Sequence, residues 1–428
     1  MRQRVAGRDA IWLQDSASNL MVINAVFITD RVGVDEVREA FQRRLLDAGE
    51  GRTYARFRHR VIWEHGQPWW EEDPEFDLTR QIIAAPEPIP TTEALRRFVG
   101  REAARPLPED RPRWQLQVVP DFEGEGTAIV GRLHHCIGDG VSLVAAIFAL
   151  MEEEIPTTTA ERRALRPGGG VPRKSWVNAL AIPLAAPGVL IRRMLWRADR
   201  HALHGPPLAG EKQVAWTEPM DIDLIKDAKN LLGATVNDVL MACVSGALSR
   251  FLQRQGGELV KQFHVSMPVN IRPPNAPLEL GNRFAAVPLQ LPAGIAALTE
   301  RVAAVKARMD ALKRSVEPIV VYGIQGALLR VLPQGVSRGL IDFLANKCTA
   351  VVTNVPGPQG TVRLAGRRVR SMVFWVPQRA RIGLGISILS FAGKVQVGII
   401  ADRSLVADVD EMVRDFEAEF EVLRTISR

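Results

Sequence analysis

The feature that most constrains the fold is the heptapeptide HHCIGDG at residues 134–140, which separates two apolar stretches. Residues 127–133 before it have the length and composition of a buried strand, and residues 141–150 after it those of an apolar helix. A strand, a turn with two glycines and a helix present a side chain from a rigid base. Since two of the seven histidines of the chain are adjacent here, we expect this turn to carry the chemistry.

The rest of the chain predicts a mixed α/β (α+β) fold. At 428 residues it is long enough for two domains. Strands are predicted at 24–28, 57–63, 114–119, 127–133, 263–267, 285–291, 349–358, 383–390 and 394–401, and helices at 34–46, 93–104, 220–232, 234–252, 295–312, 320–346 and 406–426. Residues 69–78 are expected to be a loop or an edge segment.

The predicted domain boundary is a stretch rich in Glu, Thr, Pro and Gly at residues 152–175. We therefore divide the chain into a first half (1–150), a linker (151–212) and a second half (213–428). The linker contains an apolar segment at 176–191, which is interrupted by two prolines, followed by arginines, and too short to span a membrane. Two interpretations stay open: this segment packs against the protein, or it lies in a membrane interface with its arginines on lipid phosphates.

Charge and cysteine content narrow the partners and the compartment. The net charge of +7 favours anionic partners. Nucleic acid is not expected, because no basic run is interleaved with aromatic residues. The three cysteines form no disulfide framework and no metal spacing, which favours a reducing cytosol. The basic residues 1–8 are followed by no apolar signal core, so we expect no signal peptide.

The two histidines admit several interpretations. Successive residues of a strand point to opposite faces, so His134 and His135 are expected to differ in environment. A histidine is the natural general base near neutral pH, and Asp139 either orients that base or anchors the loop through an arginine. A structural histidine pair is the alternative. We expect no metal, since further ligands at suitable spacing are missing nearby, and we do not expect Cys136 to act as a nucleophile.

The heptapeptide matches the HHxxxDG motif of the CoA- and carrier-dependent acyltransferases, which include chloramphenicol acetyltransferase and condensation domains. Within this superfamily the chain most resembles the bacterial wax ester synthase/diacylglycerol acyltransferase family. The stretches that carry this resemblance occur in the expected order: RDAIWL (8–13), PRW (112–114), ND (237–238), PVNIR (268–272), GN (281–282), TNVPGP (353–358) and GISILSFAG (385–393).

The resemblance implies two chloramphenicol-acetyltransferase-like subdomains with an active-site tunnel between them. It implies that His135 takes the proton of an acceptor hydroxyl, which attacks acyl-CoA without a covalent acyl-enzyme. Acyl-CoA is then a co-substrate, and no cofactor is bound permanently. The acceptor is a long-chain alcohol or diacylglycerol. The enzyme is expected to be cytoplasmic and to visit a membrane or lipid-droplet surface.

Further site residues follow from the resemblance. Its HHxxxDG motif also includes His134, Asp139 and Gly140, with Asp139 structural and Arg272 as its expected ion-pair partner. The candidate donors to a tetrahedral oxyanion are Asn237, Asn354 and Ser387. Asn237 and Asp238 are either catalytic or the cap of a helix, and for residues 353–358 turn chemistry alone is the alternative.

The chain departs from the family pattern at Arg113, where the family has leucine, and at Arg80-Gln81, where a histidine is expected. Gly138 is expected to make the catalytic loop looser than alanine or valine would. Two rival functions stay open: a carrier-protein-dependent, condensation-like acyltransferase, and a non-catalytic lipid-binding relative. The intact His135 and Asp139 argue against the second.

Overall fold

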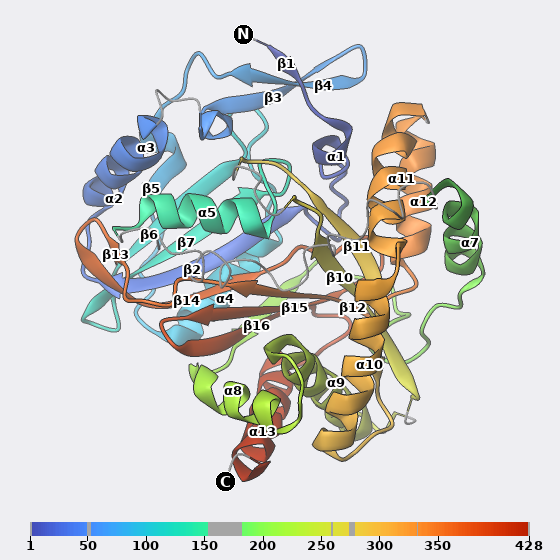
Figure 1. Cartoon of the computed structure of the whole chain (residues 1–428). Helices are drawn as coiled ribbons and strands as arrows, with labels where there is room; N and C mark the ends of the chain where they lie inside the picture. The colour runs from blue at the N-terminus through green and yellow to red at the C-terminus, as the bar shows by residue number, and fades with distance from the viewer. Residues whose placement is uncertain are drawn as a thin grey trace.

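The computed structural model describes residues 2–48, 53–152, 182–257, 260–273, 279–331 and 333–426. Over these ranges the chain is a mixed α/β protein, as predicted, with three sheets (Figure 1). The smallest sheet has the order β1-β4-β3, formed by Gln3–Arg4, Gln67–Glu72 and His59–Glu64. Its middle strand is β4, which includes the first residues of the segment 69–78. The expectation that this segment is a loop or an edge segment is therefore wrong for residues 69–72. The adjacent tryptophans alternate across this strand, and Trp70 is buried.

The sheet of the first half has the order β13-β14-β2-β7-β6-β5. Its strands are β2 (Val22–Asp30), β5 (Ile82–Ala84), β6 (Trp114–Phe122), β7 (Gly126–His134), β13 (Arg363–Leu364) and β14 (Arg367–Trp375). The predicted hairpin of β6 and β7 is present, and β7 lies in the middle of the sheet next to β2. Antiparallel to the other side of β2 lies β14, a strand that the sequence analysis does not predict. Residues from far along the chain therefore complete the sheet that carries the catalytic turn.

The sheet of the second half has the order β11-β10-β12-β15-β16-β8, with β9 also paired to β16. Its strands are β8 (Lys212–Trp216), β9 (Met220–Asp221), β10 (Gln262–Asn270), β11 (Phe284–Pro292), β12 (Ala350–Pro356), β15 (Leu384–Phe391) and β16 (Lys394–Asp402). The predicted hairpin of β15 and β16 is present. Strands β10, β12 and β15 are parallel neighbours, and such strands need long crossover connections. The crossover from β10 to β12 includes β11, α10 (Leu298–Arg314), α11 (Glu317–Val331) and α12 (Gln334–Ala345).

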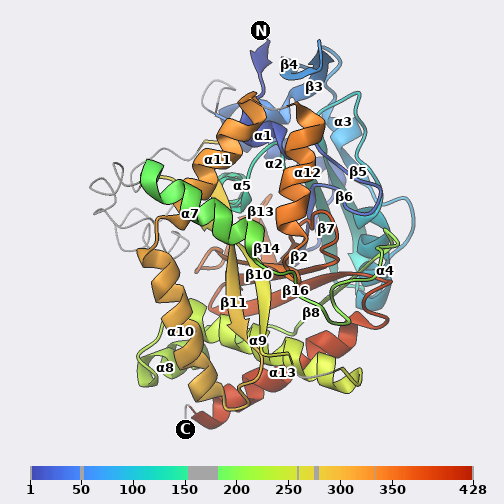
Figure 2. The ribbon, with the colours of Figure 1, turned by 90° about the vertical axis from the view of Figure 1, so that its right-hand side faces the viewer.

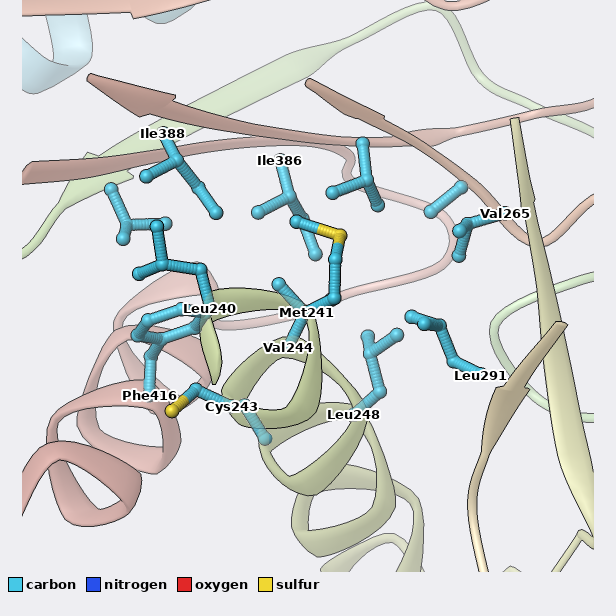
Figure 3. Packing of buried hydrophobic residues seen from close by; sticks show 14 of the residues in the cluster. Leu240, Met241, Cys243, Val244, Leu248, Val265, Leu291, Ile386, Ile388 and Phe416 are labelled. Atoms are coloured by element: carbon cyan, nitrogen blue, oxygen red, sulfur yellow. The ribbon is translucent and has the colours of Figure 1, made fainter. Parts of the chain in front are cut away.

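The core of the second half forms around α9 (Val236–Arg254), which packs between this sheet and α13 (Val409–Ile426) (Figure 3). Leu240, Val244 and Leu248 of α9 are buried, and Ile386 and Ile388 face them from β15. Burying each such side chain stabilises the fold by roughly 1.5–3 kcal/mol. The helix begins at a capping box, in which Thr235 is the N-cap. The adjacent α8 (Ile222–Leu231) lies at the same end of the molecule.

The remaining helices of the first half lie on both faces of its sheet. Helices α5 (Gly140–Leu150) and α2 (Val34–Phe41) lie on one face. Helix α2 continues as a π-helical turn to Leu46. Helix α4 (Thr92–Ala103) covers the other face and contacts β8. A Cβ at Gly100 would lie 2.7 Å from the carbonyl oxygen of Lys212, so only glycine allows this close approach between the halves.

Outside the two large sheets, α7 (Ile182–Leu195) lies beside α11 and α12 (Figure 2). The predicted linker lies outside the described residues from 153 to 181, and the division into 1–150, 151–212 and 213–428 stays a prediction. Within the described ranges, no single helix has both the length and the apolar composition to cross a bilayer, although α8 and α9, bent by 102°, meet these criteria as a pair.

Candidate active site

The heptapeptide forms the predicted strand, turn and helix. Strand β7 ends at His134, and α5 begins at Gly140. Asp139 is the N-cap of α5, where its Oδ1 accepts a hydrogen bond from the backbone N–H of Ser142 at 3.0 Å. This bond satisfies one of the free amides at the start of a helix. The turn is therefore fixed at both ends by regular structure.

His135 lies on the wall of a cavity and is 4% exposed. Its ring stacks on Trp12, with ring centroids 3.9 Å apart and an interplanar angle of 16°, and Phe284 lies at 5.7 Å. Burial lowers the pKa of His135 to about 4, although the Asp139 carboxylate acts in the opposite direction. The ring is therefore neutral at pH 7 and free to accept a proton. Its Nδ1 atom is buried and has no hydrogen-bond partner among the described residues.

His134 has a different environment, as expected for the neighbouring position of a strand. Its Nε2 lies 3.1 Å from Oδ2 of Asp15, and the side chain is buried. Burial lowers the pKa of His134, but the Cys136 and Asp15 side chains outweigh it and raise the pKa to about 9. Arg113 lies behind this pair, 3.8 Å from the Asp15 carboxylate. His134 thus ties the end of β7 to the N-terminal segment.

Asp139 forms the predicted ion pair with Arg272, at 2.7 Å between Nη1 of Arg272 and Oδ2 of Asp139. The same oxygen accepts a hydrogen bond from the backbone N–H of Arg283 at 2.8 Å. With Oδ1 bonded to Ser142, both carboxylate oxygens are occupied by groups that hold the loop in place. Of the two interpretations of Asp139, the geometry favours the anchor over the direct orientation of His135.

Gly138 packs closely against Ser142, and the expectation that it makes the catalytic loop looser than alanine or valine would stays a prediction. A Cβ at this position would collide with Oγ of Ser142 and would lie 3.4 Å from the backbone nitrogen of Gly281. Oγ of Ser142 itself donates to the carbonyl oxygens of Asp139 and Gly281, at 3.0 and 3.3 Å. A side chain at residue 138 would therefore require the Ser142 hydroxyl to move, whereas its contact with Gly281 would be an ordinary one.

The cavity has a volume of about 300 Å³ and runs between the two halves, as the resemblance implies. One side is formed by β2, β6, β7, α5 and β14, and the other by α7, α11, α12 and the strands β10 to β12. Under α5, the packed rings of Phe41, Phe57 and Trp114 line its wall. Most lining side chains are apolar; polar ones include His135, Ser266, Asn270, Thr353, Asn354 and Lys347.

The three candidate oxyanion donors are placed differently. Asn354 lines the cavity, and its Nδ2 donates to Oδ1 of Asn237 at 3.1 Å, so Asn237 supports Asn354. Ser387 is buried, and its hydroxyl accepts a hydrogen bond from the backbone N–H of Val376 at 3.0 Å. Asp238 completes the capping box of α9 with Thr235, which is the helix-cap interpretation of this motif. Which group stabilises an oxyanion stays a prediction.

The sequence assigns no role to Arg56 and Asn282, which donate hydrogen bonds to the turn, or to Asp9, which accepts hydrogen bonds from both of them. Asp9 and Asn282 were noted only as parts of the resembling stretches, and Arg56 carried no sequence signal. Asn270, which also lines the cavity, was noted only within PVNIR. Among the described residues, no group of three His, Cys, Asp or Glu side chains is arranged to hold a metal ion.

Two models of one protein family match the sequence. Residues 6–194 match the model of the wax ester synthase/diacylglycerol acyltransferase catalytic domain, and residues 280–424 that of the C-terminal domain of the same family. A putative diacylglycerol O-acyltransferase of Mycobacterium tuberculosis is 28% identical over 400 residues, covering 84% of this chain and 83% of the relative. A probable diacylglycerol O-acyltransferase of the same species is 26% identical, with 85% and 82% covered.

Solved structures share the fold. The wax ester synthase/diacylglycerol acyltransferase of Marinobacter aquaeolei superposes with a TM-score of 0.70 at 21% identity, covering 99% of this chain and 100% of that one. The first condensation domain of the calcium-dependent antibiotic synthetase gives a TM-score of 0.62 at 15% identity, covering 100% and 96%. At these identities the likeness concerns the fold alone.

Proposed function

The chain belongs to the wax ester synthase/diacylglycerol acyltransferase family and is an acyltransferase of that type, and we propose that it moves a fatty acyl group from acyl-CoA to the hydroxyl of a long-chain alcohol or of diacylglycerol. The observation that carries this proposal is a neutral, buried His135 on the wall of an apolar cavity that both halves line. The acyl donor and the acceptor must both reach this base. Each half of the chain lines part of the cavity and so offers a surface to which one of the two substrates can bind.

In the proposed mechanism, His135 is the general base. Since Nδ1 is buried, Nε2 is the ring nitrogen left for proton transfer. It takes the proton of the acceptor hydroxyl while the oxygen attacks the thioester carbon. As the tetrahedral intermediate collapses, the carbon–sulfur bond breaks and the imidazolium returns the proton to the leaving thiolate. The acyl group passes directly between the substrates, so no acyl-enzyme forms. The amide of Asn354, which lines the cavity, is the proposed oxyanion donor.

Exclusion of water is the second requirement of this chemistry, because water would otherwise accept the acyl group. The apolar walls under α5, formed by side chains such as Leu143, Ala146 and Ile147, fit an alkyl chain and leave few partners for ordered water. The stacked Trp12 and Phe284 also keep solvent from the His135 ring. These features support a lipid substrate over a small polar one.

The family match favours acyl-CoA as the donor over an acyl carrier protein, although condensation domains share the fold. A matrix of donors and acceptors tests this. Purified protein is incubated with acyl-CoAs of several lengths, or with acyl-carrier protein, against long-chain alcohols and diacylglycerol, and the product esters are quantified by mass spectrometry. We expect esters from acyl-CoA. Esters from the carrier protein alone would replace this proposal with the condensation-like one, and no ester from any pair would refute both.

We also propose that α7 and α12 dock on an anionic lipid surface. Ile191 and Leu195 of α7 are 58% and 76% exposed, and Val336 and Phe343 of α12 are 56% and 46% exposed. The inner face of α7 lines the cavity through side chains such as Leu190. A helix with exposed apolar side chains suits a membrane interface, and Arg192 beside them is 65% exposed, with its guanidinium paired to Glu317. A lipid acceptor would then lie close to the cavity.

The docking proposal predicts that an Ile191→Asp/Leu195→Asp variant binds vesicles of anionic lipid more weakly, because two exposed apolar side chains would no longer enter the interface. Cosedimentation with phosphatidylglycerol vesicles measures this. The matched control is Leu231→Asp, since Leu231 is 66% exposed on α8 at the other end of the molecule. Equal binding by wild type and both variants would show that α7 is ordinary protein surface.

A further inference from the structure

The backbone of the catalytic turn is held from outside at three successive carbonyl groups. Nδ2 of Asn282 donates to the carbonyl oxygen of His135 at 2.8 Å. Nη1 of Arg56 donates to the carbonyl oxygens of Cys136 and Ile137, at 3.2 and 2.9 Å. These carbonyl groups belong to a tight turn and have no strand or helix partner there, so the two side chains satisfy groups that would otherwise be buried without partners.

Both donors are held by one carboxylate, that of Asp9. Its Oδ1 accepts hydrogen bonds from the backbone N–H and from Nδ2 of Asn282, each at 2.9 Å. Its Oδ2 forms an ion pair with Nη2 of Arg56 at 2.7 Å. Asp9 is fully buried, so its charge is balanced by this arginine and by the amides rather than by solvent. We name Asp9, Arg56 and Asn282 the turn clamp.

The turn clamp gathers three distant parts of the chain. Asp9 lies in α1 (Gly7–Ala10), Arg56 in a 3-10 turn (Ala55–Phe57), and Asn282 just before β11. Three residues after Asp9, Trp12 stacks on the His135 ring. The same N-terminal segment therefore fixes the carbonyl group of His135, through Asn282, and one face of its ring.

We propose that Asp9, Arg56 and Asn282 are positioning residues, which hold the backbone of residues 135–137 so that the His135 ring stays in its buried site against Trp12. This inference rests on the proposed function of His135. The clamp acts through the turn and is not expected to touch substrate. A base displaced by about 1 Å loses roughly 100-fold in rate, whereas substrate affinity depends on the cavity walls, which the clamp leaves unchanged.

The first test uses Asp9→Asn, Asn282→Ala and the double variant. The control is Asp402→Asn, because Asp402 is an equally buried carboxylate, which accepts hydrogen bonds from the backbone N–H groups of Ala209 and Gly210 away from the cavity. Per folded molecule, we expect kcat for ester synthesis to fall roughly 10- to 100-fold in both single variants, with KM for acyl-CoA within about 3-fold. Asp402→Asn should change thermal stability but not kcat.

The loss of kcat in the double variant shows whether Asp9 and Asn282 act together on the turn or independently of each other. Because Asp9 acts through Asn282 and Arg56, the combined loss should be well below the product of the single losses. Multiplicative losses, or unchanged kcat in the single variants, would overturn the inference. So would an equal fall of kcat in Asp402→Asn, since that would make the loss a general effect of stability.

A second readout does not depend on activity. The proton titration of His135 is followed by NMR on histidine-labelled protein, with assignment from His135→Gln. We expect a pKa near 4 in the wild type. The Asn282 hydrogen bond itself raises the pKa of His135, so its loss alone would lower the pKa, whereas a ring that leaves its buried site would titrate closer to the ordinary value of about 6.5; we expect this rise in Asn282→Ala. An unchanged titration in a folded Asn282→Ala refutes the clamp. If the wild type makes no ester but the titration of His135 still shifts in Asn282→Ala, the proposed function is refuted and the turn clamp is not.

Discussion

At the scale of single residues, two adjacent histidines hold opposite proton preferences. The His135 ring stacks on Trp12, and burial lowers its pKa to about 4. His134 pairs with Asp15, and its pKa is raised to about 9. The alternation of a strand places one on the cavity and the other against the N-terminal segment. His135 is therefore neutral at pH 7 on the cavity wall, while His134 is held by the Asp15 carboxylate and by the backbone N–H of Cys136.

The low pKa of His135 predicts an unusual pH profile. A base must be unprotonated to act, so kcat/KM should stay level from pH 8 down to about 5 and fall only as the pH approaches 4. A histidine of ordinary pKa would lose roughly 30-fold by pH 5. Initial rates of ester synthesis, with folding checked by circular dichroism at each pH, measure the profile. An acid limb near pH 6.5 would mean that the ring is exposed to solvent during turnover.

The ion pair of Arg272 with Asp139 predicts a large stability effect. Both side chains are about 5% exposed or less, so Arg272→Ala leaves a buried carboxylate without its counter-charge. We expect the free energy of unfolding in urea to fall by about 3–5 kcal/mol. The exposed pair of Lys394 and Asp221 is the control, since Lys394→Ala should cost less than about 1 kcal/mol. Similar losses in the two variants would contradict the anchoring role of Asp139.

At the scale of elements, α5 links the turn to the cavity. It is apolar over its whole length, and several of its side chains line the cavity. The apolar stretches on either side of the turn and its two glycines are visible in the sequence, so the strand, turn and helix could be predicted. In contrast, β14 could not be predicted with its partner, because pairing with β2 is a contact between distant segments that local periodicity does not encode. The contact of Gly138 with Gly281 is likewise one between distant segments.

The position of α5 predicts control of chain length. Ala146 lines the cavity and is 4% exposed, so larger side chains there would shorten the space for an alkyl chain. We expect Ala146→Val and Ala146→Leu to shift the preferred acyl-CoA toward shorter chains in order of side-chain size. Relative kcat/KM over a series of acyl lengths is the measurement. A uniform loss at every length would indicate damage to packing rather than a change in the pocket.

At the scale of the whole molecule, the active site exists only where the halves meet. The turn comes from the first half, while Arg272, Asn282 and Asn354 come from the second. The family resemblance was enough to find the motifs that contain these residues, and to predict the ion pair of Asp139 with Arg272. It could not supply the turn clamp, because Arg56 and Asp9 reach the turn only through tertiary structure. Nor could it separate Asn354, on the cavity wall, from Ser387 behind it.

The most direct test of the account is ester synthesis by His135→Gln beside the wild type, with acyl-CoA and a long-chain alcohol. Glutamine keeps much of the volume but cannot act as a base. We predict that the variant folds with an unchanged circular dichroism spectrum, keeps KM within about 3-fold, and loses roughly 100- to 10,000-fold in kcat. Retention of wild-type kcat by the folded variant would contradict the assignment of His135 as the general base.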